Sequence, residues 1–216
     1  MNERFELRSL AADPVLAQTL AERIPDILRA TGPVSWDFQF GKGDLLERVV
    51  AASWPTPETF FAAAGCTVAL DQGTFAGLEM GYAGADFYRF KDKLAELAPP
   101  LIAAGLATPE ELIGLMERAE TASYLNAHVP ADVYYVQALY TPPDRRGSGA
   151  GKALLKSAVA RARAAGFRQL QLDVLSDNPA TDFYRANGLQ VLADITSPRL
   201  SRDHGFPSEM RMAISL

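Results

Sequence analysis

Residues 133–152 read VYYVQALYTPPDRRGSGAGK, and this stretch decides the fold. Its first eight residues, 133–140, are largely β-branched and aromatic, which predicts a strand. The segment 144–152 (DRRGSGAGK) then alternates glycines with small or polar residues. An amphipathic helix is predicted directly behind it, over 151–165. Its apolar positions are Leu154, Leu155, Ala158, Val159 and Ala162, and its basic residues Lys152, Lys156, Arg161 and Arg163 lie toward the other side. Such a loop directs several backbone N–H groups at one point, which predicts an anion site, most often for a phosphate.

Further elements are predicted on both sides of this stretch. Alternation of apolar and polar residues indicates strands at 5–10, 67–70, 75–82, 169–174, 189–193 and 209–215. Helical periodicity indicates helices at 14–30, 44–53, 86–97, 109–123 and 179–187, and a polar loop is expected before the last strand. At 216 residues, we expect a single domain over 1–216, with a helical insertion at about 84–127.

Three helix starts carry capping signals. Asp13 precedes Pro14, and Asp44 precedes an apolar helix. Thr108 and Glu111 stand three residues apart around a proline, the pattern of a capping box.

Composition excludes several function classes. The net charge of −5 offers a nucleic-acid partner no general electrostatic support. The single cysteine, Cys66, excludes an internal disulfide and a metal site built on paired cysteines. No apolar run is long enough to span a membrane or serve as a signal peptide. We therefore expect a cytoplasmic location, no metal, no nucleic acid and no membrane partner.

Two nucleotide-binding loops fit the glycine segment poorly. A nucleoside-triphosphate loop needs four residues between its first glycine and Gly-Lys, followed by Ser or Thr for magnesium. Here only three residues separate Gly147 from Gly151, and Ala153 follows Lys152. A dinucleotide-binding turn needs Gly-x-Gly-x-x-Gly, and Lys152 stands where the third glycine is required. Taken alone, the segment is also compatible with a tight turn.

A third comparison fits better. The segment resembles motif A of the GNAT superfamily of acetyl-CoA-dependent N-acetyltransferases, Arg/Gln-x-x-Gly-x-Gly/Ala, through Arg146, Gly149 and Gly151. A second block, residues 177–189, resembles the family's Asn, Ala, Phe/Leu-Tyr and Gly-Phe signature. The chain departs from the family at Thr141, where Val is usual, and at Leu189, where Phe is usual. The family's Asn falls on Asp177, with Asn178 one residue later, so either of the two matches it.

The resemblance implies a fold and a donor site. It implies an α/β (α+β) acyltransferase fold with a mixed, mostly antiparallel sheet, helices on both faces, and two parallel strands, Tyr135–Thr141 and Gln169–Val174, that splay apart. Acetyl-CoA, the acetyl donor, would bind in this splay with its pyrophosphate on the loop. The donor-binding residues implied are Leu139, Tyr140, Thr141, Arg145, Arg146, Gly147, Ser148, Gly149, Ala150, Gly151, Lys152, Asn178 and Tyr184.

The resemblance also implies the chemistry. Acetyl transfer to a primary amine needs a neutral amine and a protonated leaving thiolate. Tyr184 matches the family's tyrosine, which acts as general acid. Glu79 and Asp173 are the candidates for the general base, with Glu79 preferred. The acceptor, a small molecule or a peptide, is not identified, and a homodimer is common for the fold. The alternative is a CoA-binding sensor or structural module without turnover.

Overall fold

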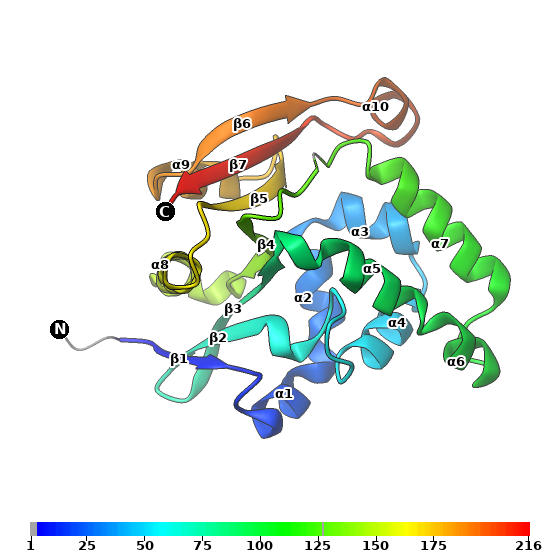
Figure 1. Ribbon diagram of the computed structural model, residues 1–216, viewed down its shortest axis with the longest axis horizontal. Coiled ribbons are helices and arrows are strands. Elements are labelled where there is room, and N and C mark those ends of the chain that lie inside the picture. The colour runs from blue at the N-terminus through cyan, green and yellow to red at the C-terminus, as the bar shows by residue number, and fades with distance from the viewer. Residues whose placement is uncertain (1–3, 127) are drawn as a thin grey trace.

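The computed structural model describes residues 4–126 and 128–216 (Figure 1). Over these residues, one sheet is formed in the order β1-β2-β3-β4-β5-β7-β6. Its strands are β1 Glu6–Ser9, β2 Cys66–Asp71, β3 Thr74–Ala83, β4 Val133–Tyr140, β5 Gln169–Leu175, β6 Gln190–Ile195 and β7 Glu209–Ser215. Neighbours are antiparallel except for β4 and β5, which are parallel. The predicted mixed, mostly antiparallel sheet is confirmed.

Helices cover both faces of the sheet (Figure 1). The α-helices are α1 Pro14–Leu20, α2 Ile24–Thr31, α3 Pro33–Phe40, α4 Leu45–Ser53, α5 Phe87–Ala95, α6 Ala98–Ala103, α7 Pro109–Ala122, α8 Ala150–Ala164, α9 Ala180–Ala186 and α10 Pro198–His204. One side, here named the α8 face, is covered by α8 and α9. The other side, the α2 face, is covered by α1 to α7. The predicted insertion thus contributes α5, α6 and α7 to the α2 face.

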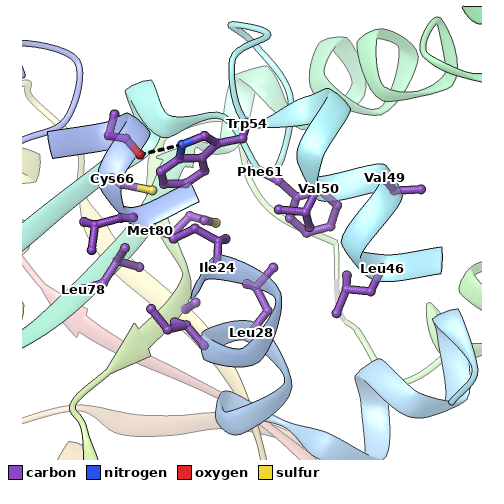
Figure 2. Packing of buried hydrophobic residues seen from close by; sticks show 14 of the residues in the cluster. Ile24, Leu28, Leu46, Val49, Val50, Trp54, Phe61, Cys66, Leu78 and Met80 are labelled. Carbon is purple, nitrogen blue, oxygen red and sulfur yellow. Dashed lines mark hydrogen bonds between the residues drawn. The ribbon is translucent and has the colours of Figure 1, made fainter. Parts of the chain in front are cut away.

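The largest core lies between the sheet and the helices of the α2 face (Figure 2). Leu28 of α2 and Leu46 of α4 have no exposed surface, and they pack toward Leu78 of β3. The indole of Trp54 is buried with them and donates a hydrogen bond to Ala17 O, 3.0 Å away. Burial of each such side chain contributes about 1.5–3 kcal/mol, so this core holds the helical layer against the strands.

Most predicted elements are confirmed, with three corrections. The helix predicted over 14–30 is interrupted by a 3₁₀ turn at Ala21–Arg23, because Pro25 lacks the N–H that would continue the ladder. Helices α3, α6 and α10 were not predicted, although each has a proline in its first turn. Asp44 makes no capping hydrogen bond and pairs with Arg48 instead. The cap of Asp13 and the capping box on α7 are confirmed.

The parallel strands β4 and β5 separate along their length. They pair only at their starts, ending with Tyr135 opposite Gln171. Beyond this point β4 continues against β3, and β5 continues against β7. The opening between residues 136–140 of β4 and 172–175 of β5 is called the β4–β5 gap below. Gln137 has no partner on β3 and forms a bulge where the gap begins.

Candidate functional site

The glycine loop ends at the first turn of α8 and presents unpaired donors. Gly147 and Gly149 have φ values of 76° and 97°, a region that favours glycine. The backbone N–H groups of Gly147, Gly149, Gly151 and Lys152 donate no hydrogen bond to any described residue. The Ala150 N–H reaches only the Ser148 hydroxyl, at 3.3 Å. Unpaired donors at a helix N-terminus form a cradle for an anion.

Of the three predicted cations of the loop, one is engaged within the protein. Arg145 is half-buried and lies 3.4 Å from the Asp71 carboxylate, which also pairs with Arg4 at 2.9 Å. Arg146 and Lys152 are exposed and form no ion pair with the described residues. These two side chains are available to a bound anion.

Two glycines bring the cradle against the open end of the β4–β5 gap. A Cβ on Gly77 of β3 would lie 2.7 Å from Tyr140 O and 3.0 Å from the Leu154 side chain of α8. A Cβ on Gly151 would lie 3.2 Å from Thr141 Oγ1. There is therefore little or no room for a larger residue, and α8 starts in close contact with the end of β4. The cradle and residues Leu139–Thr141 lie together.

Tyr184 of α9 lies in the core of the α8 face. It is 7% exposed and packs in the cluster that contains Val136 of β4 and Leu172 of β5. Its hydroxyl makes no hydrogen bond with the described residues. Burial raises the pKa of Tyr184 to about 12, so the hydroxyl keeps its proton at neutral pH.

Asn178 is engaged at the start of α9. Its side-chain oxygen accepts from the Ala180 N–H at 2.9 Å, and its Nδ2 donates to Thr31 O at 3.3 Å. Asp177 is exposed. The side-chain amide of Asn178 thus connects α9 to the end of α2.

Glu79 of β3 lies on the α8 face and is 1% exposed. Its Oε2 lies 2.5 Å from an Arg161 nitrogen, and its Oε1 accepts from the Tyr134 hydroxyl at 2.9 Å. Burial raises the pKa of Glu79, although Arg161 opposes this effect. The Arg161 side chain is 39% exposed and reaches from α8 back over the sheet to this carboxylate. With both oxygens engaged, Glu79 is poorly placed to accept a proton from a ligand.

Asp173 of β5 lies on the α2 face, and its side chain is 4% exposed. Arg211 of β7 binds both of its oxygens, at 2.5 and 2.7 Å. The Tyr135 hydroxyl donates to it across the beginning of the β4–β5 gap, at 2.9 Å. Both oxygens of the Asp173 carboxylate are therefore engaged, as those of Glu79 are.

Sequence reasoning missed three polar residues near the gap. Glu209 is the first residue of β7 and has the same side-chain parity as Arg211, so it also faces the α2 side. Asn126 follows α7, and its Nδ2 lies 3.3 Å from both Glu209 and Asp173. Gln137 Oε1 is buried with no hydrogen-bond partner among the described residues. A signal for Gln137 was present in the sequence, because it is a polar residue within the strand predicted over 133–140. No such signal marked Asn126, because a loop has no periodicity.

Neither a membrane-spanning helix nor a metal-binding group of side chains is found among the described residues. None of their helices combines the length and apolarity that crossing a bilayer requires. They also contain no group of three or more His, Cys, Asp or Glu side chains placed to hold a metal ion.

Comparisons with known proteins agree with this geometry. The family model described as Acetyltransferase (GNAT) family matches residues 60–189, more than half of the chain. An N-acetyltransferase from Staphylococcus aureus is similar with a TM-score of 0.61 at 16% identity, covering 98% of this chain and 100% of that one. An agmatine N-acetyltransferase has a TM-score of 0.59 at 16% identity, with coverage of 99% and 100%.

A further similar structure contains a ligand. PaiA N-acetyltransferase from Thermoplasma acidophilum, in complex with coenzyme A, has a TM-score of 0.50 at 14% identity, with coverage of 99% and 100%. At these identities the likeness is one of fold. A comparison with curated proteins finds no match.

Proposed function

This chain belongs to the GNAT family of acetyltransferases, and we propose that it transfers an acetyl group from acetyl-CoA to a primary amine. The observation that carries the proposal is the cradle of unpaired N–H groups at the open end of the β4–β5 gap. The donor's pyrophosphate fits this cradle in charge and in hydrogen-bonding capacity. The coenzyme A in the similar Thermoplasma structure supports the same donor.

The gap suits the remainder of the donor. The edge of β4 that faces β5 is unpaired beyond Tyr135, so an extended chain with amide groups can pair with it as an added strand would. Arg146 and Lys152 supply charge at the entrance. Gln137 Oε1, buried at the inner end of the gap, is an acceptor that a ligand N–H would satisfy.

The chemistry requires a proton donor for the leaving thiolate. The amine nitrogen forms a bond to the acetyl carbon and loses a proton, the carbon–sulfur bond breaks, and the sulfur takes a proton. We propose Tyr184 as this donor, because its hydroxyl is protonated, belongs to the cluster beside β4 and β5, and has no competing partner among the described residues. Glu79 is assigned to holding Arg161 and Tyr134 rather than to taking the amine's proton.

Calorimetric titration with acetyl-CoA and with CoA tests donor binding. We expect saturable binding of both, and no heat at millimolar concentration would contradict the proposal. Incubation of acetyl-CoA with the protein and a panel of polyamines, amino acids, aminoglycosides and peptides then tests turnover, read as free thiol. Binding without thiol release for any amine would support a CoA-binding module in its place.

Tyr184→Phe tests the general acid. Loss of the hydroxyl should lower kcat by about 10²-fold or more with little change in acetyl-CoA affinity. Phenylalanine keeps the buried ring, so the fold should be retained. An unchanged kcat would remove Tyr184 from the mechanism.

A further inference from the structure

We propose that Glu209 is the general base of this reaction. The acceptor's amine binds between Glu209 and Asp173, at the place that the side-chain amide of Asn126 occupies in this structure. The inference rests on the proposed acetyl transfer and names residues that neither the resemblance nor the family match assigns.

The position of Glu209 on the sheet is the first argument. Asp173 lies two residues beyond Gln171, the last residue of β5 that pairs with β4. Glu209 pairs with Leu175 at the outer end of the same strand, and its side chain shares the α2 face with Asp173. The Asp173 side chain therefore borders the β4–β5 gap, and Glu209 lies beside it on the next strand, both on the face opposite Tyr184. A base on one face of the sheet and an acid on the other suit approach of the amine from one side and departure of the thiol on the other.

The balance of charge is the second argument. Arg211 and Tyr135 satisfy Asp173, and the Arg211 guanidinium lies 5.4 Å from the Tyr135 ring centroid. Tyr82 of β3 completes the surroundings, with its ring 5.3 Å from that of Tyr135. One guanidinium thus faces two carboxylates. Ionised Glu209 leaves this cluster with one negative charge in excess, and a protonated amine would neutralise it.

The contacts of Asn126 are the third argument. Its Nδ2 lies 3.3 Å from Asp173 Oδ2 and 3.3 Å from Glu209 Oε2. An ammonium group has the same donors with a charge added, and charge-assisted hydrogen bonds are shorter, about 2.7–2.9 Å. Asn126 is exposed, on the segment after α7. An amine can therefore displace a weakly held amide and gain stronger bonds than the amide makes.

The protonation of Glu209 agrees with this role. Burial and the neighbouring Asp173 raise the pKa of Glu209 to about 7, and Arg211 opposes them. A carboxylate with such a pKa is a stronger proton acceptor than an ordinary one and is still largely ionised just above neutrality.

The reaction begins at the ammonium group of the acceptor. The ammonium N–H bond breaks and its proton passes to a Glu209 oxygen, which leaves a lone pair on nitrogen. That pair forms the C–N bond, the C–S bond breaks, and Tyr184 protonates the sulfur. Solvent takes the proton from Glu209. After the C–N bond has formed, the nitrogen still carries two protons and a positive charge, and it gives one of them through solvent to the Tyr184 oxygen, so the products are an N-acetylamine and the free thiol.

The test compares Glu209→Gln with wild type in thiol-release assays from pH 5.5 to 9. The amines are 1,4-diaminobutane, tyramine, lysine, kanamycin and a tripeptide. We expect kcat/KM for the amine to fall about 100-fold or more. The rise in rate through pH 7 should disappear, and KM for acetyl-CoA should stay unchanged. Glu209→Asp should retain part of the rate. Glu22→Gln is the matched control, an exposed glutamate between α1 and α2.

The outcomes are distinguishable. If wild type releases no thiol with any amine, the proposed function fails and this inference with it. If wild type is active and Glu209→Gln stays within threefold, or loses rate with the pH profile unchanged, only the base assignment is overturned. Gln matches Glu in size and carries no charge, so the melting temperature should confirm that the variant folds.

Discussion

Each face of the sheet carries a buried cluster built on a carboxylate, an arginine and a tyrosine, and the two clusters differ in their balance of charge. On the α8 face, Glu79 binds Arg161 and Tyr134. On the α2 face, Asp173 binds Arg211 and Tyr135, and the two tyrosines are consecutive in β4. The first cluster is closed, with one carboxylate for one guanidinium. The second has an additional carboxylate, Glu209. The difference separates a structural ion pair from a cluster with one charge available for chemistry.

Replacing the arginine of either cluster should lower the free energy of unfolding more than the other changes below. The loss should be larger for Arg211 on the α2 face than for Arg161 on the α8 face. The Arg211 side chain is 3% exposed, whereas that of Arg161 is 39% exposed. Arg211→Met leaves buried carboxylates unpaired and should cost about 3–5 kcal/mol. Arg161→Met leaves one buried carboxylate, Glu79, instead of two, and burial raises its pKa so that it takes up a proton more readily; the cost should not exceed about 3 kcal/mol. Urea unfolding of both variants measures this, and equal losses would show that the clusters do not differ.

The second prediction concerns pH. The folded protein holds a proton on Glu209 up to about pH 7, whereas the ordinary value is 4.5. The folded state therefore binds more protons than the unfolded state between these values, and stability falls as pH rises through this window. Glu209→Gln should match wild type below pH 4.5 and exceed it by up to about 3 kcal/mol at pH 8. A constant difference across the window would contradict the raised pKa.

Substitution of the two tyrosines should lower the free energy of unfolding least. Tyr134→Phe and Tyr135→Phe each remove a hydrogen bond to a carboxylate, so each should cost about 1–3 kcal/mol. Their effects on turnover should differ, because only Tyr135 orients Asp173 beside the amine. We expect kcat/KM to fall in Tyr135→Phe and to stay near wild type in Tyr134→Phe. The reverse pattern in the thiol assay would move the acceptor to the α8 face.

Local sequence was sufficient to predict the elements that form the proposed donor site. The glycine loop, the helix behind it and the separation of β4 from β5 follow from turn residues, periodicity and family motifs, all within 133–189. Helix α3 was missed because Gly32-Pro33 is read equally as the end of one helix and the start of the next.

The polar clusters could not be predicted in the same way. Arg161 lies on a helix face that periodicity assigns to solvent, and only the tertiary fold shows that its long side chain reaches Glu79. Glu209 and Asp173 are 36 residues apart and meet through strand register, which a single sequence does not determine. Asn126 reaches them from a segment without periodicity.

Side-by-side thiol-release assays of Glu79→Gln and Glu209→Gln test the central claim most directly, because each variant neutralises one candidate base, and the two lie on opposite faces of the sheet. The account predicts a loss of about 100-fold or more in kcat/KM for Glu209→Gln and less than threefold for Glu79→Gln. A large loss in Glu79→Gln together with a near-normal rate in Glu209→Gln would place the base on the α8 face and contradict the account.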